Sequence, residues 1–457
     1  MPAFILLSLI QSCHNSGSII TYPAIPGLET SELYTVTVNG ESVWTEKVRT
    51  RMDIEKLDDW FTSEPFTRVQ QEIHIASCSG RGTLRIRIKA SVPLAEVRIR
   101  PASRQIVAAI KGNMFEFILP GPDKLYIEVN DLPPLCLLIH PPESNVPAKN
   151  DTDVRYFSPG VHRPGLMTMN NNEKIYIAGG ALVYGGIRAD SVSNIKVYGR
   201  GILDGNFEHS RMVLIKNCDN VEFNGIMIRN GRSWTNTVIN CDSVKYEDVA
   251  VVSFGPGGDG INPLGSRHFM INNCFFRCTD DCMAIKSPDT THVVRDILVT
   301  NNTMAGYAFS DGITIGFETN GPLIEDVTVR NCDILMARGG SRVDGHSAFS
   351  IICDGPAMIR NILFENIRVE QPVLKLFELH ITDGTKYGDN PPGHIRDISL
   401  KNISWQTTGP VILQGLDTAH RVENVTFENC SAGGRLLKGT DDDVFRINEY
   451  VSGVIVR

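Results

Sequence analysis

One position recurs along the last two thirds of this chain of 457 residues. A small, acidic or amide residue stands two positions after each of a series of short apolar blocks. These residues are Gly199, Gly225, Asp248, Asn273, Asn301, Asn331, Asn366, Asn402 and Asn429. Successive members lie 23 to 36 residues apart, and strand-like segments without a helical pattern fill the intervals. A repeat of this length predicts a solenoid, and a right-handed parallel β-helix over residues 153–457 fits it best.

Equivalent residues of neighbouring coils in such a solenoid stack at strand spacing, about 4.8 Å apart. The asparagines of the recurring position between Asn301 and Asn429 are therefore expected to form an amide ladder in the turns. Their predicted role is structural, because each side chain can bond the backbone or the next asparagine.

The chain has eleven cysteines. Cys274, Cys278 and Cys282 recur every four residues, but no histidine flanks them at zinc spacing, so the sequence argues against a metal site. Cysteines and aliphatic residues interchange next to the recurring position, which is typical of small core side chains. Cys218 and Cys241 share another stacked position, and we expect both to be free thiols.

Residues 21–152 carry a different pattern of short segments in which apolar and polar residues alternate. These segments are Tyr34–Val38, Leu84–Ile88, Val97–Arg100, Phe115–Leu119 and Leu125–Val129. Alternation with a period of two predicts strands that are buried on one face, and several antiparallel strands at this spacing predict a β-sandwich. The expected fold is therefore all-β, with an N-terminal β-sandwich followed by a right-handed parallel β-helix solenoid.

Residues 1–20 are expected to form a leader outside both domains. Phe4–Ile10 is an apolar run too short to span a bilayer, and no later stretch has the length and hydropathy of a membrane helix. Cys13 follows it as in a bacterial lipobox, which makes Cys13 a candidate lipid-attachment site. The predicted location is secreted, or anchored in the periplasm or at the outer membrane of a bacterium.

A nucleic-acid partner is disfavoured by the charge. Lys and Arg number 44 against 52 Asp and Glu, which gives a net charge of −8, whereas phosphate backbones need clustered cations. We expect a monomer.

Three aspartates break the apolar pattern of the coils at matching places. Asp259, Asp281 and Asp311 lie 22 and 30 residues apart, close to one coil each, and Asp280 precedes the middle one. Carboxylates on adjacent rungs repel one another, so at least one pKa is expected to rise toward neutral pH. A glycosidase requires one protonated and one ionised carboxyl group in the same groove.

Other interpretations of these aspartates remain open. Asp-Gly pairs are common in turns, so Asp259-Gly260 and Asp311-Gly312 taken alone indicate turns. Carboxylates on adjacent coils also suit a calcium ion, which polysaccharide lyases on β-helices use together with a basic residue. Strict alternation would send Asp280 and Asp281 to opposite faces, so both reach one groove only if the backbone turns there.

At these residues the chain resembles the polygalacturonase-like enzymes of glycoside hydrolase family 28. The string from Asp280 to Ser287 is similar to the double-aspartate motif of that family, and Asp259-Gly260-Ile261 matches its upstream motif at the aspartate. The resemblance implies inversion without a metal or organic cofactor, with Asp280 as general acid and Asp259 and Asp281 holding the attacking water. The region around Phe157–His162, after a β-sandwich, is also similar to the dextranase and isopullulanase family, family 49.

The chain departs from family 28 at the motifs with which that family binds a uronate. Its Gly-His-Gly is Ser310-Asp311-Gly312 here, and its Arg-Ile-Lys occurs as Arg87-Ile88-Lys89, inside the predicted sandwich. Candidate substrate-binding residues are Asp311, Lys286, Arg338, Arg342 and His346, and candidate sugar-stacking rings are Trp234 and Tyr307.

The sequence therefore predicts an inverting glycoside hydrolase that cleaves a plant or microbial polysaccharide, or an oligosaccharide derived from it, by an aspartate acid/base mechanism. Two alternatives stay open: an α-glucanase like the family 49 enzymes, and a non-catalytic β-helix that binds glycans.

Overall fold

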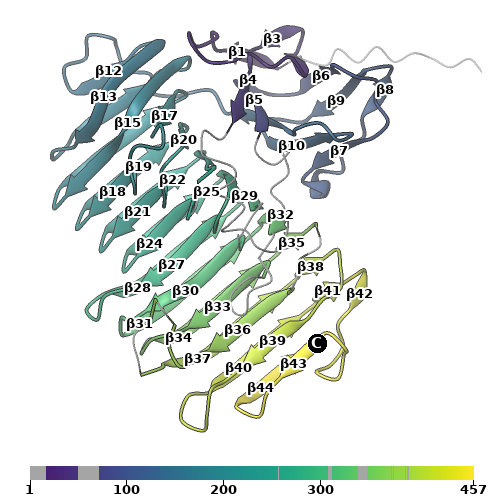
Figure 1. Ribbon diagram of the computed structural model, residues 1–457, viewed down its shortest axis with the longest axis vertical. Helices are drawn as coiled ribbons and strands as arrows, with labels where there is room; N and C mark the ends of the chain where they lie inside the picture. The colour runs from purple at the N-terminus through teal and green to yellow at the C-terminus, as the bar shows by residue number, and fades with distance from the viewer. Residues whose placement is uncertain are drawn as a thin grey trace, which may run out of the picture.

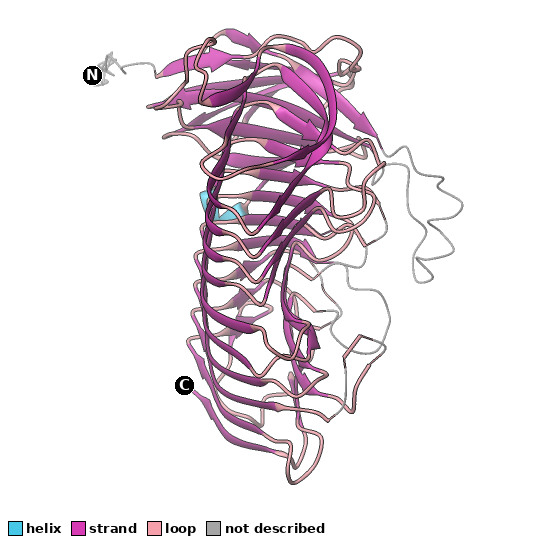
Figure 2. Cartoon of the chain, turned by 90° about the vertical axis from the view of Figure 1, so that its left-hand side faces the viewer, coloured by secondary structure: helices cyan, strands magenta, loops and turns pink. Residues whose placement is uncertain are grey.

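The computed structural model describes residues 17–49, 72–255, 257–306, 311–337, 347–371, 373, 375–385, 387–388 and 391–457. Almost every element in this part of the chain is a strand, and the one short helix is the 3-10 turn Ala102–Arg104 (Figure 2). A β-sandwich lies beside the N-terminal part of a long parallel β-helix (Figure 1). The predicted fold class is thus confirmed.

The sandwich consists of two sheets, which hold six and five strands among the described residues. The strands of the first sheet are β1 (Ser18–Thr21), β4 (Thr45–Arg49), β5 (Glu72–Arg81), β7 (Val97–Arg100), β10 (Lys124–Val129) and β11 (Leu135–His140). Those of the second are β2 (Tyr34–Val38), β3 (Glu41–Val43), β6 (Leu84–Ala90), β8 (Ala109–Lys111) and β9 (Met114–Leu119). Alternate residues of β6, such as Leu84, Ile86 and Ile88, face a core to which both sheets contribute.

Two details of the N-terminal region differ from the sequence prediction. β11 pairs with β5 in parallel, whereas the sequence predicts antiparallel strands. That prediction rests on the alternating segments, and β11 is not one of them because it is buried along its whole length. Residues 18–20, which the sequence prediction places in the leader segment 1–20, belong to strand β1 and pair with β5. Ile19 and Ile20 favour the strand conformation because isoleucine is β-branched. Cys13 lies outside the described residues.

The first sheet of the β-helix has twelve parallel strands in the part of the chain that the structure describes. They are β12 (Val154–Phe157), β14 (Lys174–Ile177), β16 (Ser193–Gly199), β19 (Asp219–Asn224), β22 (Asp242–Glu247), β25 (Arg267–Asn272), β28 (Val293–Thr300), β31 (Leu323–Arg330), β34 (Met358–Glu365), β37 (His394–Lys401), β40 (Val422–Glu428) and β44 (Val451–Val456). Each strand pairs with its counterpart one coil later, as a solenoid requires.

The second sheet bends around the coil, so most coils contribute two short strands to it. Within the described ranges its strands are β13 (Gly160–Thr168), β15 (Ala181–Asp190), β17 (Ile202–Asp204), β18 (Val213–Lys216), β20 (Met227–Arg229), β21 (Asn236–Ile239), β23 (Ala250–Val252), β24 (Ile261–Leu264), β26 (Phe275–Cys278), β27 (Met283–Ser287), β29 (Thr303–Gly306), β30 (Ile313–Thr319), β32 (Asp333–Ala337), β33 (Phe349–Cys353), β35 (Arg368–Val369), β36 (Phe377–Ile381), β38 (Ser404–Trp405), β39 (Val411–Gln414), β41 (Ser431–Ala432), β42 (Arg435–Leu436) and β43 (Phe445–Ile447). Strands β41 and β42 pair antiparallel and the other pairs are parallel.

The asparagine ladder is present for most of its predicted length. Asn366 donates from its amide to Asn331 Oδ1 at 3.1 Å, Asn402 to Asn366 at 2.9 Å and Asn429 to Asn402 at 2.7 Å. Asn301 instead bonds Asn272 Oδ1 at 2.8 Å. All five asparagines have φ between 52° and 57°, a left-handed conformation that asparagine tolerates well, which explains why the turns select this residue.

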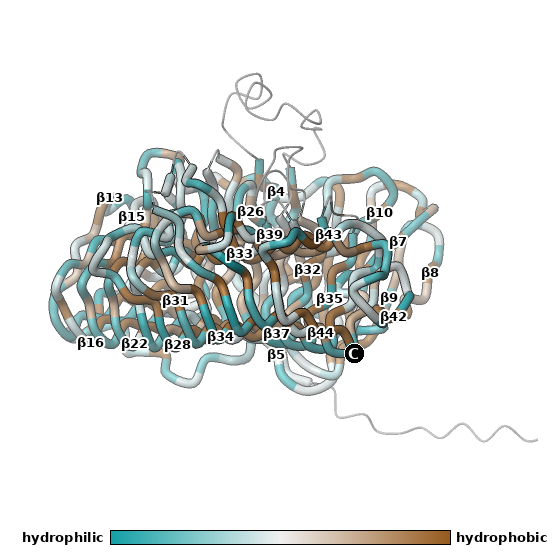
Figure 3. Tube along the Cα trace, turned by 90° about the horizontal axis from the view of Figure 1, so that it is seen from below, coloured by the Kyte–Doolittle hydropathy of each residue, from teal (hydrophilic) through white to brown (hydrophobic). Residues whose placement is uncertain are grey.

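The interior of the coils is a continuous apolar column, and hydrophobic segments gather in the middle of the molecule when it is seen from below (Figure 3). Cys218, Cys241, Cys274 and Cys332 are buried in it as free thiols. The sandwich packs against the coils through a second apolar cluster, in which Ile75 and Leu138 meet Leu182 and Met227.

Buried ion pairs fasten the sandwich to the coils. Asp248, at the turn before β23, contacts Lys124 Nζ at 2.5 Å, His140 Nδ1 at 3.0 Å and Arg200 at 3.4 Å. Arg229 of β20 bridges Glu46 of the sandwich at 2.8 Å and Asp204 at 2.7 Å. Further along the coils, Arg100 contacts Glu370 at 2.6 Å and Arg104 contacts Asp333 at 3.1 Å.

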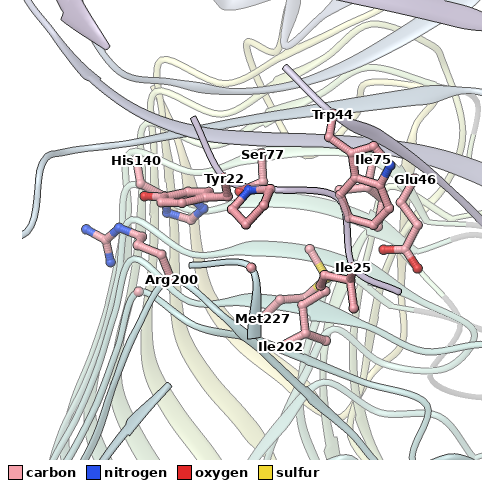
Figure 4. A pocket seen from close by; sticks show the side chains of 13 residues that line it. Tyr22, Ile25, Trp44, Glu46, Ile75, Ser77, His140, Arg200, Ile202 and Met227 are labelled. Atoms are coloured by element: carbon pink, nitrogen blue, oxygen red, sulfur yellow. The ribbon is translucent and has the colours of Figure 1, made fainter. Parts of the chain in front are cut away.

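A small pocket remains between the two parts of the molecule, with Trp44, Tyr22 and His140 above it and Met227 below (Figure 4). Its volume is about 40 Å³, room for a few water molecules, whereas ligand sites typically enclose roughly 300 Å³ or more. The candidate functional site therefore lies elsewhere, at the aspartates.

Candidate active site

The register of three neighbouring strands places the aspartates level with one another. Ile261 of β24 pairs with Met283 of β27, and Met283 pairs with Ile313 of β30. Asp259, Asp281 and Asp311 each stand two residues before these partners, so they occupy equivalent positions of successive coils, as their spacing predicts. Trp234 has the same place one coil earlier, because Asn236 pairs with Ile261.

The backbone turn that the double aspartate requires is present. The chain bends at residues 279–280, between β26 and β27, and the N–H of Asp281 donates to Asp280 Oδ1 at 3.1 Å. Gly260 lets the next coil approach closely, since a Cβ there would lie 2.3 Å from the carbonyl oxygen of Cys282. Asp280 and Asp281 are both partly exposed at this bend.

Asp259 is more enclosed than Asp280 and Asp281, with 3% of its surface exposed. Its carboxylate accepts a hydrogen bond from Asn262 Nδ2 at 2.8 Å. Burial and the negative charges of Asp280 and Asp281 raise the pKa of Asp259 well above its usual value, and Lys286 opposes this effect. The three carboxyl groups are therefore near enough to titrate together.

The double aspartate also has raised pKa values. Burial raises the pKa of Asp280. Burial and the charge of Asp280 raise the pKa of Asp281 to about 8, although Asp281 Oδ1 accepts a hydrogen bond from the N–H of Asp311 at 3.0 Å. A cluster of this kind keeps a proton near neutral pH while another member stays ionised, which is the condition for acid and base catalysis in one place.

Asp311, a predicted substrate contact, turns toward the following coil. It is fully buried, its Oδ1 accepts from the N–H of Ser347 at 2.9 Å, and its Oδ2 accepts from the hydroxyl of Ser350 at 2.5 Å. Burial and the charge of Asp281 raise the pKa of Asp311 well above its usual value. Both oxygens are thus bonded within the protein, and a substrate contact of Asp311 stays a prediction.

Lys286 and Trp234 lie beside the aspartates. The ammonium of Lys286 contacts Glu318 Oε2 at 2.7 Å and sits 5.3 Å from the centre of the Trp234 ring, which is half-buried. The guanidinium of Arg211 lies 4.9 Å from the same ring. Sequence reasoning missed Glu318, because its approach depends on an irregularity in β30 that leaves no periodic signal.

Several predicted residues lie outside the described part of the chain: Arg338, Arg342, His346, Tyr307 and Ser310. Arg87-Ile88-Lys89 lies in β6 of the sandwich, as predicted. Among the described residues, no group of three or more His, Cys, Asp or Glu side chains has the arrangement to hold a metal ion.

The raised pKa of Asp281 has a consequence for stability. Between about pH 4 and pH 8 the folded protein binds a proton here that the unfolded chain has already lost, so this group's contribution to stability is full below about pH 4 and falls as the pH rises toward 8. Asp281→Asn keeps an acceptor for the N–H of Asp311 and removes the titration. We expect this variant to gain about 1–3 kcal/mol relative to wild type between pH 4 and pH 8.

Thermal unfolding of Asp281→Asn and wild type across this pH range measures the effect. A difference in Tm that is the same at both ends of the range would contradict the raised pKa of Asp281.

The chain is similar to several known proteins. Residues 168–442 match the family described as Glycosyl hydrolases family 28. A probable exopolygalacturonase B of Aspergillus flavus is 25% identical over 252 residues, covering 47% of this chain and 55% of the relative. An endo-polygalacturonase of Pectobacterium carotovorum subsp. carotovorum is 27% identical over 189 residues, covering 41% and 42%. The chain thus spans about half the length of the curated relatives it matches.

Two solved structures share the fold. Dex49A from Penicillium minioluteum superposes with a TM-score of 0.61 at 14% identity, covering 96% of each chain. A hyperthermoactive exopolygalacturonase from Thermotoga maritima superposes with a TM-score of 0.52 at 16% identity, covering 66% of this chain and 83% of that one. The family match extends over more than half of the sequence and includes all of the aspartates described above. The chain belongs to glycosyl hydrolases family 28.

Proposed function

We propose that this protein is an inverting glycoside hydrolase in which Asp280 is the general acid and Asp259 and Asp281 hold and activate the attacking water. The observation that carries the proposal is that Asp259 and Asp281 stand level on successive coils with Asp280 next to Asp281, close enough for the charges of Asp280 and Asp281 to raise the pKa of Asp259. Membership of a glycosyl hydrolase family supports the reaction class.

The chemistry follows from two carboxyl groups in opposite protonation states. Asp280 gives its proton to the glycosidic oxygen as the bond from C1 to that oxygen breaks, so the leaving sugar departs as an alcohol. Water attacks C1 from the other face of the ring, and its proton passes to whichever of Asp259 and Asp281 is ionised. The anomeric centre inverts, and one proton has moved from the acid to the base.

The relatives favour a pectic polysaccharide, or an oligosaccharide cut from one, as the substrate. They are polygalacturonases, and a galacturonan carries one carboxylate on each residue. We propose this class first.

A neutral glycan such as an α-glucan is the second candidate, and the charges around the site favour it. Glu318 and Asp311 add carboxyl groups to the three aspartates, and Glu378 adds another beside Asp311. The ammonium of Lys286, which opposes them, is paired with Glu318. A uronate would experience repulsion from this arrangement.

A panel of pectic, dextran and algal glycans tests the reaction, with proton NMR of the first-formed anomer. We expect new reducing ends whose anomeric configuration is opposite to that of the bond cleaved. An unsaturated product that needs calcium would identify a lyase instead, and tight binding without cleavage of any glycan would identify a glycan-binding β-helix.

Export of the enzyme and a monomeric state are parts of the same proposal, because a polysaccharide is met outside the cell. Over the described ranges, the structure contains no helix with the length and hydropathy needed to cross a membrane. Lipid attachment at Cys13 stays a prediction.

A further inference from the structure

Strand β30 carries an irregularity next to the aspartates. Ile285 of β27 pairs with Ile315 of β30, but two residues later Ser287 pairs with Thr319. A single residue of β27, Lys286, therefore faces three residues of β30, 316–318. Bulges of this kind redirect a side chain, and here the redirected side chain is that of Glu318.

The sequence is suited to this bulge at two positions. Gly316 has φ of 102°, and a Cβ there would lie 2.0 Å from the carbonyl oxygen of Ile352, so the position excludes every other residue. Glu318 itself has φ of 60°, which a non-glycine residue adopts only where the surroundings hold it. Its side chain makes the 2.7 Å ion pair with Lys286.

The pair is enclosed. The side chain of Lys286 is 7% exposed and that of Glu318 is 20% exposed, so water screens their attraction only partly. The charged groups that face the ammonium are Glu318 from β30, Asp259 from the turn before β24 and Asp281 from the turn before β27.

Three further acidic groups border this arrangement. Asp280 adjoins Asp281, Asp311 lies before β30, and Glu378 of β36 lies beside Asp311. The ammonium of Lys286 thus interacts with Asp259 and Asp281 as well as with Glu318.

We propose that Glu318 is a positioning residue for the reaction at the aspartates, because it holds the ammonium of Lys286 and shares the positive charge of that group with Asp259 and Asp281. This inference rests on the hydrolase activity proposed above. Glu318 acts through Lys286 and does not itself touch the reacting atoms.

The direction of the effect follows from the charges. Lys286 opposes the rise in the pKa of Asp259 and Asp281, whereas Glu318 adds to the rise at Asp281. In Glu318→Gln the negative charge is gone and the whole charge of Lys286 acts on the aspartates, so both limbs of the profile of kcat/KM against pH are expected to move to lower pH by about 0.5–1 unit. Lys286→Met is expected to move them to higher pH.

The experiment compares pH profiles of wild type, Glu318→Gln, Glu318→Asp, Lys286→Met and the double variant Glu318→Gln/Lys286→Met. Glu318→Asp keeps the charge and is expected to restore most of the wild-type profile. The double variant is expected to lie at slightly lower pH than Lys286→Met, by less than the shift that Glu318→Gln causes in the wild type, since Glu318 then acts on Asp281 only through its own charge and has no cation to hold. Glu325→Gln is the matched control, because Glu325 is a buried glutamate of β31 paired with Arg295 and Arg360.

Two outcomes would overturn the inference: a Glu318→Gln profile that superposes on wild type, or a shift that persists unchanged when Lys286 is methionine. A measurement made without substrate distinguishes a failure of this inference from a failure of the hydrolase proposal. The change in Tm between pH 5 and pH 8 is expected to be smaller in Glu318→Gln than in wild type, because aspartates with lower pKa values lose less stability over that range. If no glycan is cleaved, this comparison still decides whether Glu318 acts on the aspartates.

Discussion

Asp280→Asn is expected to lower the rate of glycoside hydrolysis by about 10²–10⁴-fold, the usual contribution of a general acid. An amide has nearly the shape of the carboxyl group but has no acidic proton to give to the leaving oxygen. The side chain lies at the bend before β27, and the N–H of Asp281 donates to it, a contact that the amide oxygen can keep. We therefore expect the loss in kcat, with KM or the binding constant for the glycan nearly unchanged.

The control for this prediction is Asp289→Asn, a change of the same chemistry in the exposed turn after β27. It is expected to retain wild-type activity. Asp259→Asn and Asp281→Asn should lose activity as well, since they remove the groups that receive the proton of the water. An Asp280→Asn enzyme with more than about a tenth of the wild-type kcat would show that the acid is another member of the cluster.

Asp248→Asn is expected to lower the free energy of unfolding by about 3–5 kcal/mol, the largest effect on stability that we expect from a single substitution. The amide suits the left-handed conformation of this residue, whose φ is 59°, so backbone strain contributes little. The loss comes from leaving Lys124 and Arg200 buried without their counter-charge. Urea unfolding at neutral pH measures the difference.

The pH dependence gives an independent check. Although burial acts in the opposite direction, the charges of His140, Lys124 and Arg200 hold the pKa of Asp248 well below its usual range. Its stabilising effect is therefore present above about pH 4 and lost as the pH falls further, so the two proteins are expected to converge in acid.

Asp242→Asn, which removes a partly exposed carboxylate paired with Arg267 and His268, is the matched control for Asp248→Asn and is expected to cost about 1 kcal/mol or less. Equal effects of the two substitutions would contradict the buried network.

The repeat made most of the β-helix predictable. The recurring asparagines mark the turn of each coil because one left-handed conformation is needed there every time, and the structure has bonded them in a ladder from Asn331 to Asn429. The alignment of Asp259 with Asp281 and Asp311 follows from the same periodicity. What repeats along a solenoid can be read from its sequence.

Features that depend on a single departure from the period could not be predicted. Glu318 reaches Lys286 through a bulge in β30, and no neighbouring coil supplies a second example. The sandwich packs against the β-helix through pairs that are distant in sequence, such as Arg100 and Glu370. Neither surface carries a charge pattern that distinguishes it in the sequence. The parallel pairing of β11 with β5 is likewise a matter of tertiary arrangement.

The connections between paired strands vary in length while the strands stay in register. Eight residues join β23 to β24 and four join β26 to β27, yet Ile261 and Met283 still pair. The scaffold thus separates two design variables, the alignment of the acidic residues and the material built around them. Lengthening one connection is expected to change which sugars fit the site without moving the acidic residues. Substrate specificity can therefore change through one coil at a time.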